Sequence, residues 1–271
     1  MSQALTFIPP IFEPMERGSV TDIAGKEKKK NTRWAGAVDI NSEDNDDPFI
    51  AVEGSWIVSR PYPPTASWTA DGWKNGRVKA GTWVGIDGYH TKDKARLLQG
   101  GTGQRCIVTS QYQTIEQTTR AWVEWTPDEP HWFSNFEVRP GDLVTTIVES
   151  VNPKKGKIMI FNRSASTYSI AYLKMPEEGL PIKGLTAEWI VEGSDVDDPV
   201  WGTSFLGATF IFDCWATTES LDDKDLSNAK LVNMLRDGQP YIEAKKENNN
   251  LVGLFDTTTR ATYTKVDSID K

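Results

Sequence analysis

The clearest indication of the fold is Thr82-Trp83-Val84-Gly85-Ile86-Asp87-Gly88, in which apolar and polar residues alternate. A second stretch, Ala187-Glu188-Trp189-Ile190-Val191-Glu192, has the same period of two. This alternation predicts β-strands whose polar members, including Glu188, lie on one face. Gln99 follows Gly88 by eleven residues. A carboxyl and a carboxamide brought together on such a face could activate water and stabilise an oxyanion.

Strand-like stretches recur along the chain from about residue 31 onward. Clusters of Gly, Pro, Asn and Asp separate them, and a helical period is suggested only over residues 227–236, where Leu231, Met234 and Leu235 could form one turn. Many short strands with frequent turns predict an all-β antiparallel sandwich or barrel. The expected strands cover residues 49–58, 78–86, 105–113, 119–125, 143–151, 157–162, 169–172, 187–192, 208–215, 251–255 and 262–266.

The length and composition predict one domain with an N-terminal extension. The chain has 271 residues, 38% of them hydrophobic, which is enough to bury a sizeable core. All-β domains of this length commonly form one unit, so residues 31–271 are expected to fold together. Residues 1–30 lack periodicity, contain Pro9, Pro10 and Pro14, and end in a lysine-rich run. This composition predicts a poorly ordered extension.

The charge and hydropathy of the chain argue against several classes of partner. A formal charge of −8 is unfavourable for nucleic-acid binding, which needs a concentrated positive field. No apolar run approaches the roughly 20 residues that span a bilayer, and no secretory signal is visible, so the compartment stays open. The acidic run at residues 41–47 lacks the central Gly of an EF-hand calcium loop. We expect a monomer that uses no metal and no cofactor.

Seven short motifs follow one another along most of the chain, and the ordered set is more specific than any single motif. They are residues 31–38 (NTRWAGAV), 52–58 (VEGSWIV), 83–99, 121–128 (AWVEWTPD), 140–142 (PGD), 187–192 (AEWIVE) and 210–214 (FIFDC). The set resembles the glutamic peptidases, or eqolisins, which are fungal acid endopeptidases. The resemblance implies two curved antiparallel sheets packed face to face, similar to the concanavalin A lectins. It also implies a polypeptide substrate and a catalytic dyad of Gln99 and Glu188.

The resemblance further suggests which residues surround this dyad. Four residues match family positions that hold the dyad by hydrogen bonds: Trp83, Asp87, Trp122 and Glu124. Residues 126–135, which include Thr126 and Trp132, match the hairpin loop that closes over the substrate. Trp83, Trp122 and Trp132 are candidates for lining a groove, although buried packing explains most of the 11 tryptophans.

The implied chemistry divides the work between the two members of the dyad. The Glu188 carboxylate would accept a proton from the attacking water and return it to the leaving amine. The Gln99 amide would donate to the oxyanion. A free glutamate has a pKa of about 4.3, so an acidic optimum is expected unless burial raises that value.

Two positions differ from the usual family pattern, because Arg120 and Thr126 stand where an Asp and a Tyr are common. Strand parity places Arg120 on the face of Trp122 and Glu124, where its charge would favour an ionised Glu188. These differences leave open an activity that is reduced, shifted in pH or absent.

Other interpretations also stay open. The chain could be a lectin-like module with an idle dyad, which binds a carbohydrate or a peptide. Glu124 and Glu188 could instead be the two carboxyls of a glycosidase. Glu192 could replace Glu188 if the strand register differs. A serine triad is poorly supported, since His90 and His131 are the only histidines and no Gly-x-Ser-x-Gly motif occurs. The two cysteines, Cys106 and Cys214, are expected to be buried thiols.

Overall fold

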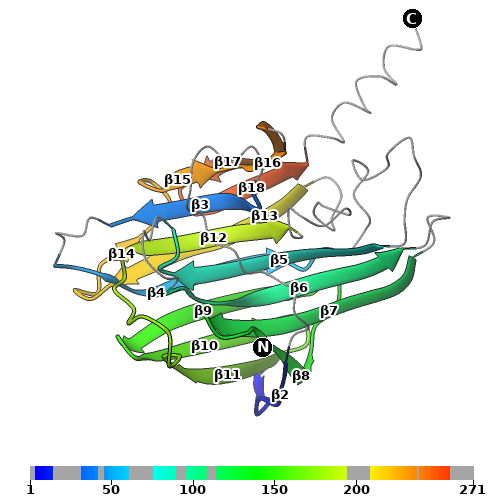
Figure 1. Cartoon of the computed structure of the whole chain (residues 1–271), viewed down its shortest axis with the longest axis horizontal. Helices are drawn as coiled ribbons and strands as arrows, with labels where there is room; N and C mark the ends of the chain where they lie inside the picture. Colours follow the sequence, from blue (N-terminus) through cyan, green and yellow to red (C-terminus); the bar gives the residue numbers. More distant parts are fainter. Residues whose placement is uncertain are drawn as a thin grey trace, which may run out of the picture.

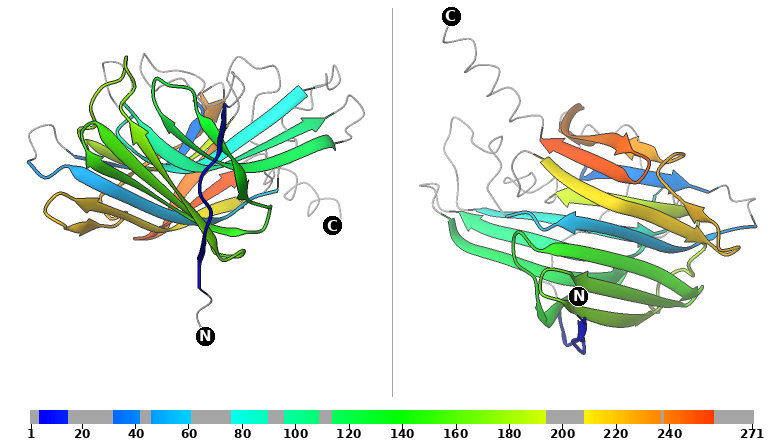
Figure 2. Two further views of the ribbon diagram at one scale, coloured as in Figure 1. Left: turned by 90° about the horizontal axis from the view of Figure 1, so that it is seen from below. Right: turned by 180° about the vertical axis from the view of Figure 1, so that it is seen from behind.

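The computed structural model of the chain describes residues 4–14, 32–41, 46–60, 76–89, 96–108, 114–193, 208–236 and 238–256. Every helix or strand assigned in these ranges is a β-strand. The strands form two stacked sheets, and all of the described pairings except β1 with β11 are antiparallel. Figure 1 shows one sheet in front, and the view from behind in Figure 2 shows the other. The antiparallel β-sandwich predicted from the sequence is confirmed.

The first sheet has ten strands, and hydrophobic side chains alternate along them. In β10, Ile158 and Ile160 are fully buried, whereas Lys157, Met159 and Phe161, which alternate with them, are partly exposed. The spatial order is β1 (Thr6–Phe7), β11 (Thr167–Lys174), β10 (Lys155–Asn162), β9 (Leu143–Asn152), β4 (Phe49–Ile57), β13 (Ala208–Thr218), β18 (Leu251–Asp256), β17 (Gln239–Asn248) and β16 (Met234–Arg236), with β14 (Asp223–Lys224) also paired with β13.

The second sheet has eight strands and carries both stretches that open the sequence argument. The spatial order is β15 (Lys230–Val232), β3 (Trp34–Ile40), β12 (Thr186–Gly193), β5 (Gly76–Ile86), β6 (Leu98–Val108), β7 (Thr114–Trp125), β8 (His131–Glu137) and β2 (Phe12–Pro14). The AEWIVE motif lies in β12 and the WVGIDG motif begins in β5, so the two stretches are hydrogen-bonded neighbours.

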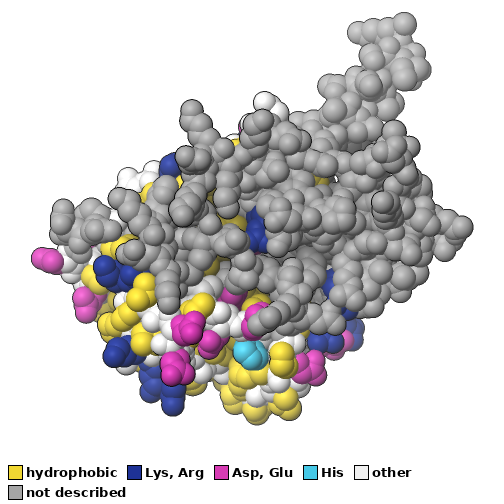
Figure 3. Space-filling view, viewed as in Figure 1, with side chains coloured by type: hydrophobic (Ala, Val, Ile, Leu, Met, Phe, Trp, Pro, Cys, Tyr) yellow, Lys and Arg dark blue, Asp and Glu magenta, His cyan; other side chains and the backbone are white. Residues whose placement is uncertain are grey.

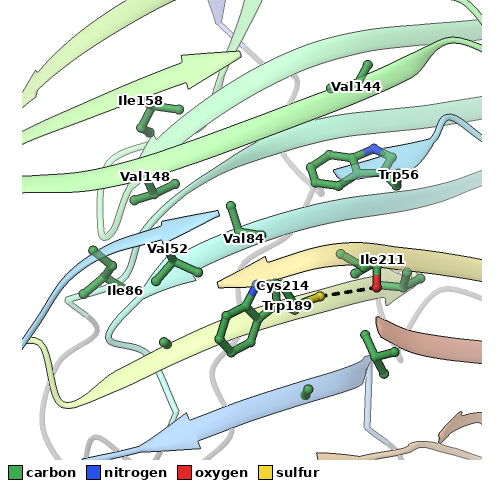
Figure 4. Close-up of a cluster of buried hydrophobic side chains, with 14 of the residues drawn as sticks. Val52, Trp56, Val84, Ile86, Val144, Val148, Ile158, Trp189, Ile211 and Cys214 are labelled. Carbon is green, nitrogen blue, oxygen red and sulfur yellow. Dashed lines mark hydrogen bonds between the residues drawn. The ribbon is translucent and has the colours of Figure 1, made fainter. Parts of the chain in front are cut away.

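The main core fills the space between the sheets. Figure 4 shows Trp56, Val84, Val148, Ile158 and Trp189 meeting there from both sheets. Two buried indoles in this core donate hydrogen bonds across the sheets, which offsets the cost of burying their polar N–H groups. The Trp189 indole donates to the backbone oxygen of Glu53 at 2.7 Å, and the Trp56 indole donates to Thr102 Oγ1 at 2.9 Å.

The eight-stranded sheet is also buried on its other face. All eight residues of β12 are buried, because Ala187, Trp189 and Val191 face the main core while a second cluster covers the opposite side. That second cluster consists of Val38, Trp83, Leu97, Trp122 and Ile190, with Trp34, Tyr89, Trp132 and Val232 packed against it. We call this side of the sheet, which carries the second cluster, the site face.

The N-terminal extension is part of the sandwich, so the prediction of a poorly ordered segment is wrong for residues 4–14. Strand β1 pairs with β11 at the edge of the ten-stranded sheet, and β2 pairs with β8 at the edge of the eight-stranded sheet. Phe12 packs against Phe133 with ring centroids 5.0 Å apart. The arm therefore links the edges of the two sheets. Residues 15–30 lie outside the described ranges.

Two further predictions about local structure are corrected. Residues 227–236 contain strands β15 and β16 rather than a helical turn. The segment expected to be a loop over residues 126–135 is a short turn followed by β8, which starts at His131. Cys214 is a buried free thiol, as expected, whereas the side chain of Cys106 and residues 42–45 of the acidic run are outside the described part. Within the described part, we find no helix of the length and apolarity that a membrane crossing requires.

Candidate active site

The strand register aligns three of the predicted site residues, Glu188, Gln99 and Glu124, in one row across the site face. Glu188 pairs with Gly85, Gly85 pairs with Gln99, and Gln99 pairs with Glu124. Aligned residues in neighbouring strands point to the same side of a sheet. Neighbouring strands lie about 4.8 Å apart, so the backbones of Glu188 and Gln99 are about 10 Å apart, with a glycine between them. The register therefore brings the carboxyl and the carboxamide to one face without an intervening side chain.

The next row along the strands is aromatic. Ile190, Trp83, Gly101, Trp122 and Trp132 are aligned across β12, β5, β6, β7 and β8. A Cβ at Gly101 would lie 2.1 Å from the backbone oxygen of Thr82, so no larger residue fits between the two indoles. The predicted groove-lining tryptophans thus lie together beside the dyad row. Trp83 and Trp122 are fully buried and Trp132 is partly exposed.

Glu188 is completely buried and is held through only one of its two oxygens. Thr186 Oγ1 donates to Glu188 Oε1 at 2.5 Å, and the backbone N–H of Tyr89 donates to the same oxygen at 3.3 Å. Glu188 Oε2 is buried with no hydrogen-bond partner among the described residues. Burial raises the pKa of Glu188 to about 8, with a further rise from the Asp87 charge, against the lowering effect of the bonds from Thr186 and Tyr89. Glu188 is therefore protonated in mildly acidic solution.

Gln99 and Glu124 form a buried pair in the same row. Gln99 Nε2 donates to Glu124 Oε2 at 2.7 Å. Burial raises the pKa of Glu124 well above the usual glutamate value, and the nearby Glu192 raises it further. Gln99 Oε1 and Glu124 Oε1 have no hydrogen-bond partner within the described ranges. Glu188, Gln99 and Glu124 thus each have one buried side-chain oxygen that could accept a hydrogen bond from water or substrate.

Asp87 holds the segment that precedes β12 through hydrogen bonds. It has a positive φ of 60°, a conformation that Asp tolerates better than most residues. Its carboxylate accepts hydrogen bonds from the backbone N–H groups of Lys183, Gly184 and Leu185 at 2.6–3.2 Å. Burial nevertheless raises the pKa of Asp87. Because Thr186 and Glu188 follow directly, Asp87 fixes the start of the strand that carries the carboxyl.

The remaining predicted site residues have structural contacts. Thr126 Oγ1 accepts from the backbone N–H of Leu97 at 2.9 Å, so Thr126 helps to fix the chain that leads to Gln99. Glu192 Oε2 accepts from the Trp83 indole at 3.2 Å, and Glu192 Oε1 lies 3.9 Å from Arg33 Nε. Glu192 is thus engaged and lies two residues beyond the aromatic row, which leaves Glu188 as the carboxyl opposite Gln99.

Arg120 does not contact Glu188, which corrects the hypothesis that its charge holds Glu188 ionised. Arg120 Nη1 donates to Glu13 Oε2 at 3.0 Å, and both side chains are about half exposed. The interactions that shift the pKa of Glu188 come from burial, Thr186, Asp87 and Tyr89. The position of Arg120 on the site face agrees with strand parity, but its partner comes from the N-terminal arm.

Two contacts of Glu188 were not predicted from the sequence. Thr186 lies two residues before Glu188, so strand parity alone could have placed it on the same face. No sequence pattern predicts the contact with the backbone N–H of Tyr89, because this contact depends on how the chain turns after Asp87. Within the described residues, no group of three or more His, Cys, Asp or Glu side chains is arranged to hold a metal ion.

Comparisons with known proteins agree with this arrangement. Residues 32–254 match the model of the peptidase A4 family. Aspergillopepsin-2 of Aspergillus niger is 27% identical over 222 residues, which cover 79% of this chain and 73% of the relative. Scytalidopepsin B of Scytalidium lignicola is 26% identical over 225 residues, which cover 78% of this chain and 75% of the relative.

Solved structures share the fold. A crystal structure of scytalido-glutamic peptidase with a transition state analog inhibitor superposes with a TM-score of 0.61 at 20% identity, covering 83% of this chain and 98% of that chain. The aspergilloglutamic peptidase from Aspergillus niger has a TM-score of 0.56 at 25% identity, covering 66% of this chain and 99% of that one. Because the family match spans most of the sequence, the chain belongs to the peptidase A4 family and is a glutamic endopeptidase.

Proposed function

We propose that the enzyme hydrolyses peptide bonds of polypeptides with Glu188 and Gln99 as its catalytic dyad. The observation that carries this proposal is the row in which Glu188, Gly85 and Gln99 are aligned on one face. The glycine leaves space between the two side chains, and each side chain keeps a buried oxygen that has no hydrogen-bond partner among the described residues. A water held between these oxygens would stand next to a scissile carbonyl.

Glu188 would act as the general base and then as the general acid. Its Oε1 is occupied by Thr186 and Tyr89, so Oε2 is the oxygen that exchanges protons. As the water attacks the carbonyl carbon, one water proton moves to Oε2 and a tetrahedral intermediate forms. The same proton then moves to the leaving amine as the C–N bond breaks, which restores the carboxylate.

Gln99 would stabilise the intermediate through its amide. One N–H of its Nε2 is donated to Glu124, which fixes the orientation of the amide, and the other N–H remains for the oxyanion. Its Oε1 is an acceptor that can orient the attacking water. An amide does not titrate in this pH range, so Glu188 alone supplies the catalytic proton transfer.

The direct test is digestion of an unfolded protein by the purified chain at about pH 2 to 8, with mass-spectrometric identification of the products. We expect internal cleavage that is insensitive to chelators and to reagents that modify serine or cysteine, because the proposed mechanism uses no metal ion, serine or cysteine. Loss of activity with a chelator, or binding without cleavage at every pH, would reject the proposal.

The pH profile should be shifted upward from that of an ordinary carboxyl. Because the pKa of Glu188 is raised to about 8, the base form is lost as pH falls through that value, and kcat/KM falls with it. We therefore expect the acidic limb of kcat/KM to lie well above pH 4.5, the unshifted glutamate value. Initial rates across the pH range check this. An acidic limb at or below the unshifted glutamate pKa would mean that Glu188 is exposed to water in the free enzyme.

Changing Thr186 should move this limb in a predictable direction. Thr186→Val removes the hydrogen bond that favours the ionised form, so the pKa of Glu188 should rise further, by about one unit for a bond to a charged group. Thr186→Ser keeps the hydroxyl and should restore the wild-type limb. The check is the kcat/KM profile of both variants. Equal profiles for Val and Ser would show that the hydroxyl does not tune Glu188.

A further inference from the structure

Beyond the aromatic row, the site face continues in a third row that contains Arg120. Gly81 pairs with Glu192 and with Gly103, and Gly103 pairs with Arg120. Arg120 lies four residues from Glu124 on β7, which is about 14 Å along an extended strand. The two glycines contribute no side chains to this row. Trp132 partly fills the space, since a Cβ on Gly103 would lie 2.6 Å from Trp132 Cη2.

The carboxylate that Arg120 binds is also carried on the site face. Glu13 pairs with Trp132 across β2 and β8, so its side chain points to the same side as Trp132. Arg120 Nη1 donates to Glu13 Oε2 at 3.0 Å, and the two side chains are 42% and 54% exposed. Arg120 thus already binds an acidic side chain presented by an extended strand. Figure 3, drawn in the view of Figure 1, shows both basic and acidic side chains on the lower part of the described surface.

We propose that Arg120 is a specificity-determining residue that binds an acidic side chain of the polypeptide substrate. Glu13 would occupy the same guanidinium in the free enzyme and compete with the substrate. This inference rests on the proposed function, because it takes the site face as the place where the polypeptide lies. If the substrate runs along the strands, the acidic residue would be about four residues from the cleaved bond.

The charges around Arg120 support an exchange of partners. An exposed ion pair contributes only about 0 to 1 kcal/mol, so a substrate carboxylate can displace Glu13 at small cost. A cavity of about 520 Å³ opens beside Arg120, between β7 and β8. The other arginine that lines it, Arg139, donates to Glu137 at 2.7 Å. Arg120 is therefore the lining arginine whose carboxylate partner comes from a distant segment.

The pair is not needed to hold the N-terminal arm in place. Ile11 N–H donates to Asn135 Oδ1 at 3.0 Å, Asn135 Nδ2 donates to the backbone oxygen of Pro9 at 2.7 Å, and Ser134 N–H donates to the backbone oxygen of Ile11 at 2.8 Å. Phe12 adds its ring contact with Phe133. Because none of these contacts uses the side chain of Glu13, we expect the arm to keep them when Glu13 is replaced, so Glu13 and Arg120 can be tested without removing the strand.

The test uses the full chain and a neutral peptide into which Glu or Gln is placed at each position in turn. We expect one position at which Glu raises kcat/KM about fivefold over Gln at a pH above the carboxyl pKa of about 4.3, with the preference lost in high salt. In peptide binding, the preference should also be lost below that pKa. The preference should disappear in Arg120→Gln, and Arg120→Asp should prefer Lys at that position. Glu13→Gln should strengthen the Glu preference about twofold or more.

A matched control and a second readout keep the two proposals separable. Arg163 donates to Thr145 on the ten-stranded sheet, so Arg163→Gln should keep the Glu preference. Peptide dissociation constants measured with Glu188→Gln report the same preference without turnover. If no peptide is cleaved, the proposed function fails, and the dissociation constants still decide the role of Arg120. Cleavage or binding with equal preference for Glu and Gln, or a preference that survives in Arg120→Gln, would overturn this inference.

Discussion

Replacing Glu188 by Gln is expected to lower kcat by roughly a thousandfold or more, because the proton transfer that a positioned carboxyl supplies is lost. The substitution keeps the shape of the side chain and keeps an oxygen that can accept from Thr186 and Tyr89. The fold should therefore persist. The measurement is the single-turnover rate on a peptide that the wild-type enzyme cleaves, with the near-UV circular dichroism spectrum as the check on folding.

The matched control for this variant is Glu53→Gln. Glu53 is a partly buried glutamate in a central strand, and burial raises its pKa as it does for the fully buried Glu188, but Glu53 lies on the ten-stranded sheet. It should keep nearly full activity. A Glu188→Gln enzyme with more than about a tenth of the wild-type kcat would exclude Glu188 as the proton-transfer group, because a general base contributes at least about a hundredfold. Loss of activity in both variants would show that the enzyme is sensitive to any loss of a buried carboxyl.

The placement of the dyad shows what sequence patterns can and cannot predict. Period-two alternation places Glu188 and Glu192 on one face of their strand, and the ordered motifs indicate the family. The row that joins Glu188, Gly85 and Gln99 depends on the register between strands distant in sequence. A shift of one residue would turn Gln99 into the main core. The register of these strands depends on how their side chains pack on both faces of the sheet, and a single sequence does not show this packing.

The errors in the sequence analysis have local physical causes. Residues 4–14 looked like a disordered tail because Pro9, Pro10 and Pro14 interrupt any pattern, yet proline is compatible with an edge strand such as β2. The first five residues of β8 fall in the segment 126–135, which the resemblance matches to a hairpin loop and in which Pro127 and Pro130 interrupt any strand pattern. In residues 227–236 the spacing of three apolar side chains imitated a helix, although they come from two short strands that belong to different sheets.

The protein should be most stable in mildly acidic solution and should lose stability as the pH rises toward 8. Glu188 has a folded-state pKa of about 8 against an ordinary value of 4.5, so its contribution is complete below about pH 4.5 and is lost as pH rises through the folded value. One pKa unit corresponds to about 1.4 kcal/mol, so this residue alone accounts for a loss on the order of 5 kcal/mol. Burial raises the pKa of Glu124 and Asp87 too, so they act in the same direction.

Thermal unfolding followed between about pH 4.5 and pH 8 tests this expectation, and the wild-type Tm should fall by about 10 °C or more. In Glu188→Gln the buried group no longer titrates, so the fall in Tm should be clearly smaller, whereas Glu178→Gln, which changes an exposed glutamate, should behave like the wild type. The lowered pKa values of Asp47 and Asp225 act oppositely, since their contribution is lost only as pH falls below the ordinary value of 3.8. A Tm that rises from pH 4.5 to 8, or a pH dependence unchanged in Glu188→Gln, would mean that Glu188 is ionised in the folded protein, and the expected upward shift of the acidic limb would fail with it.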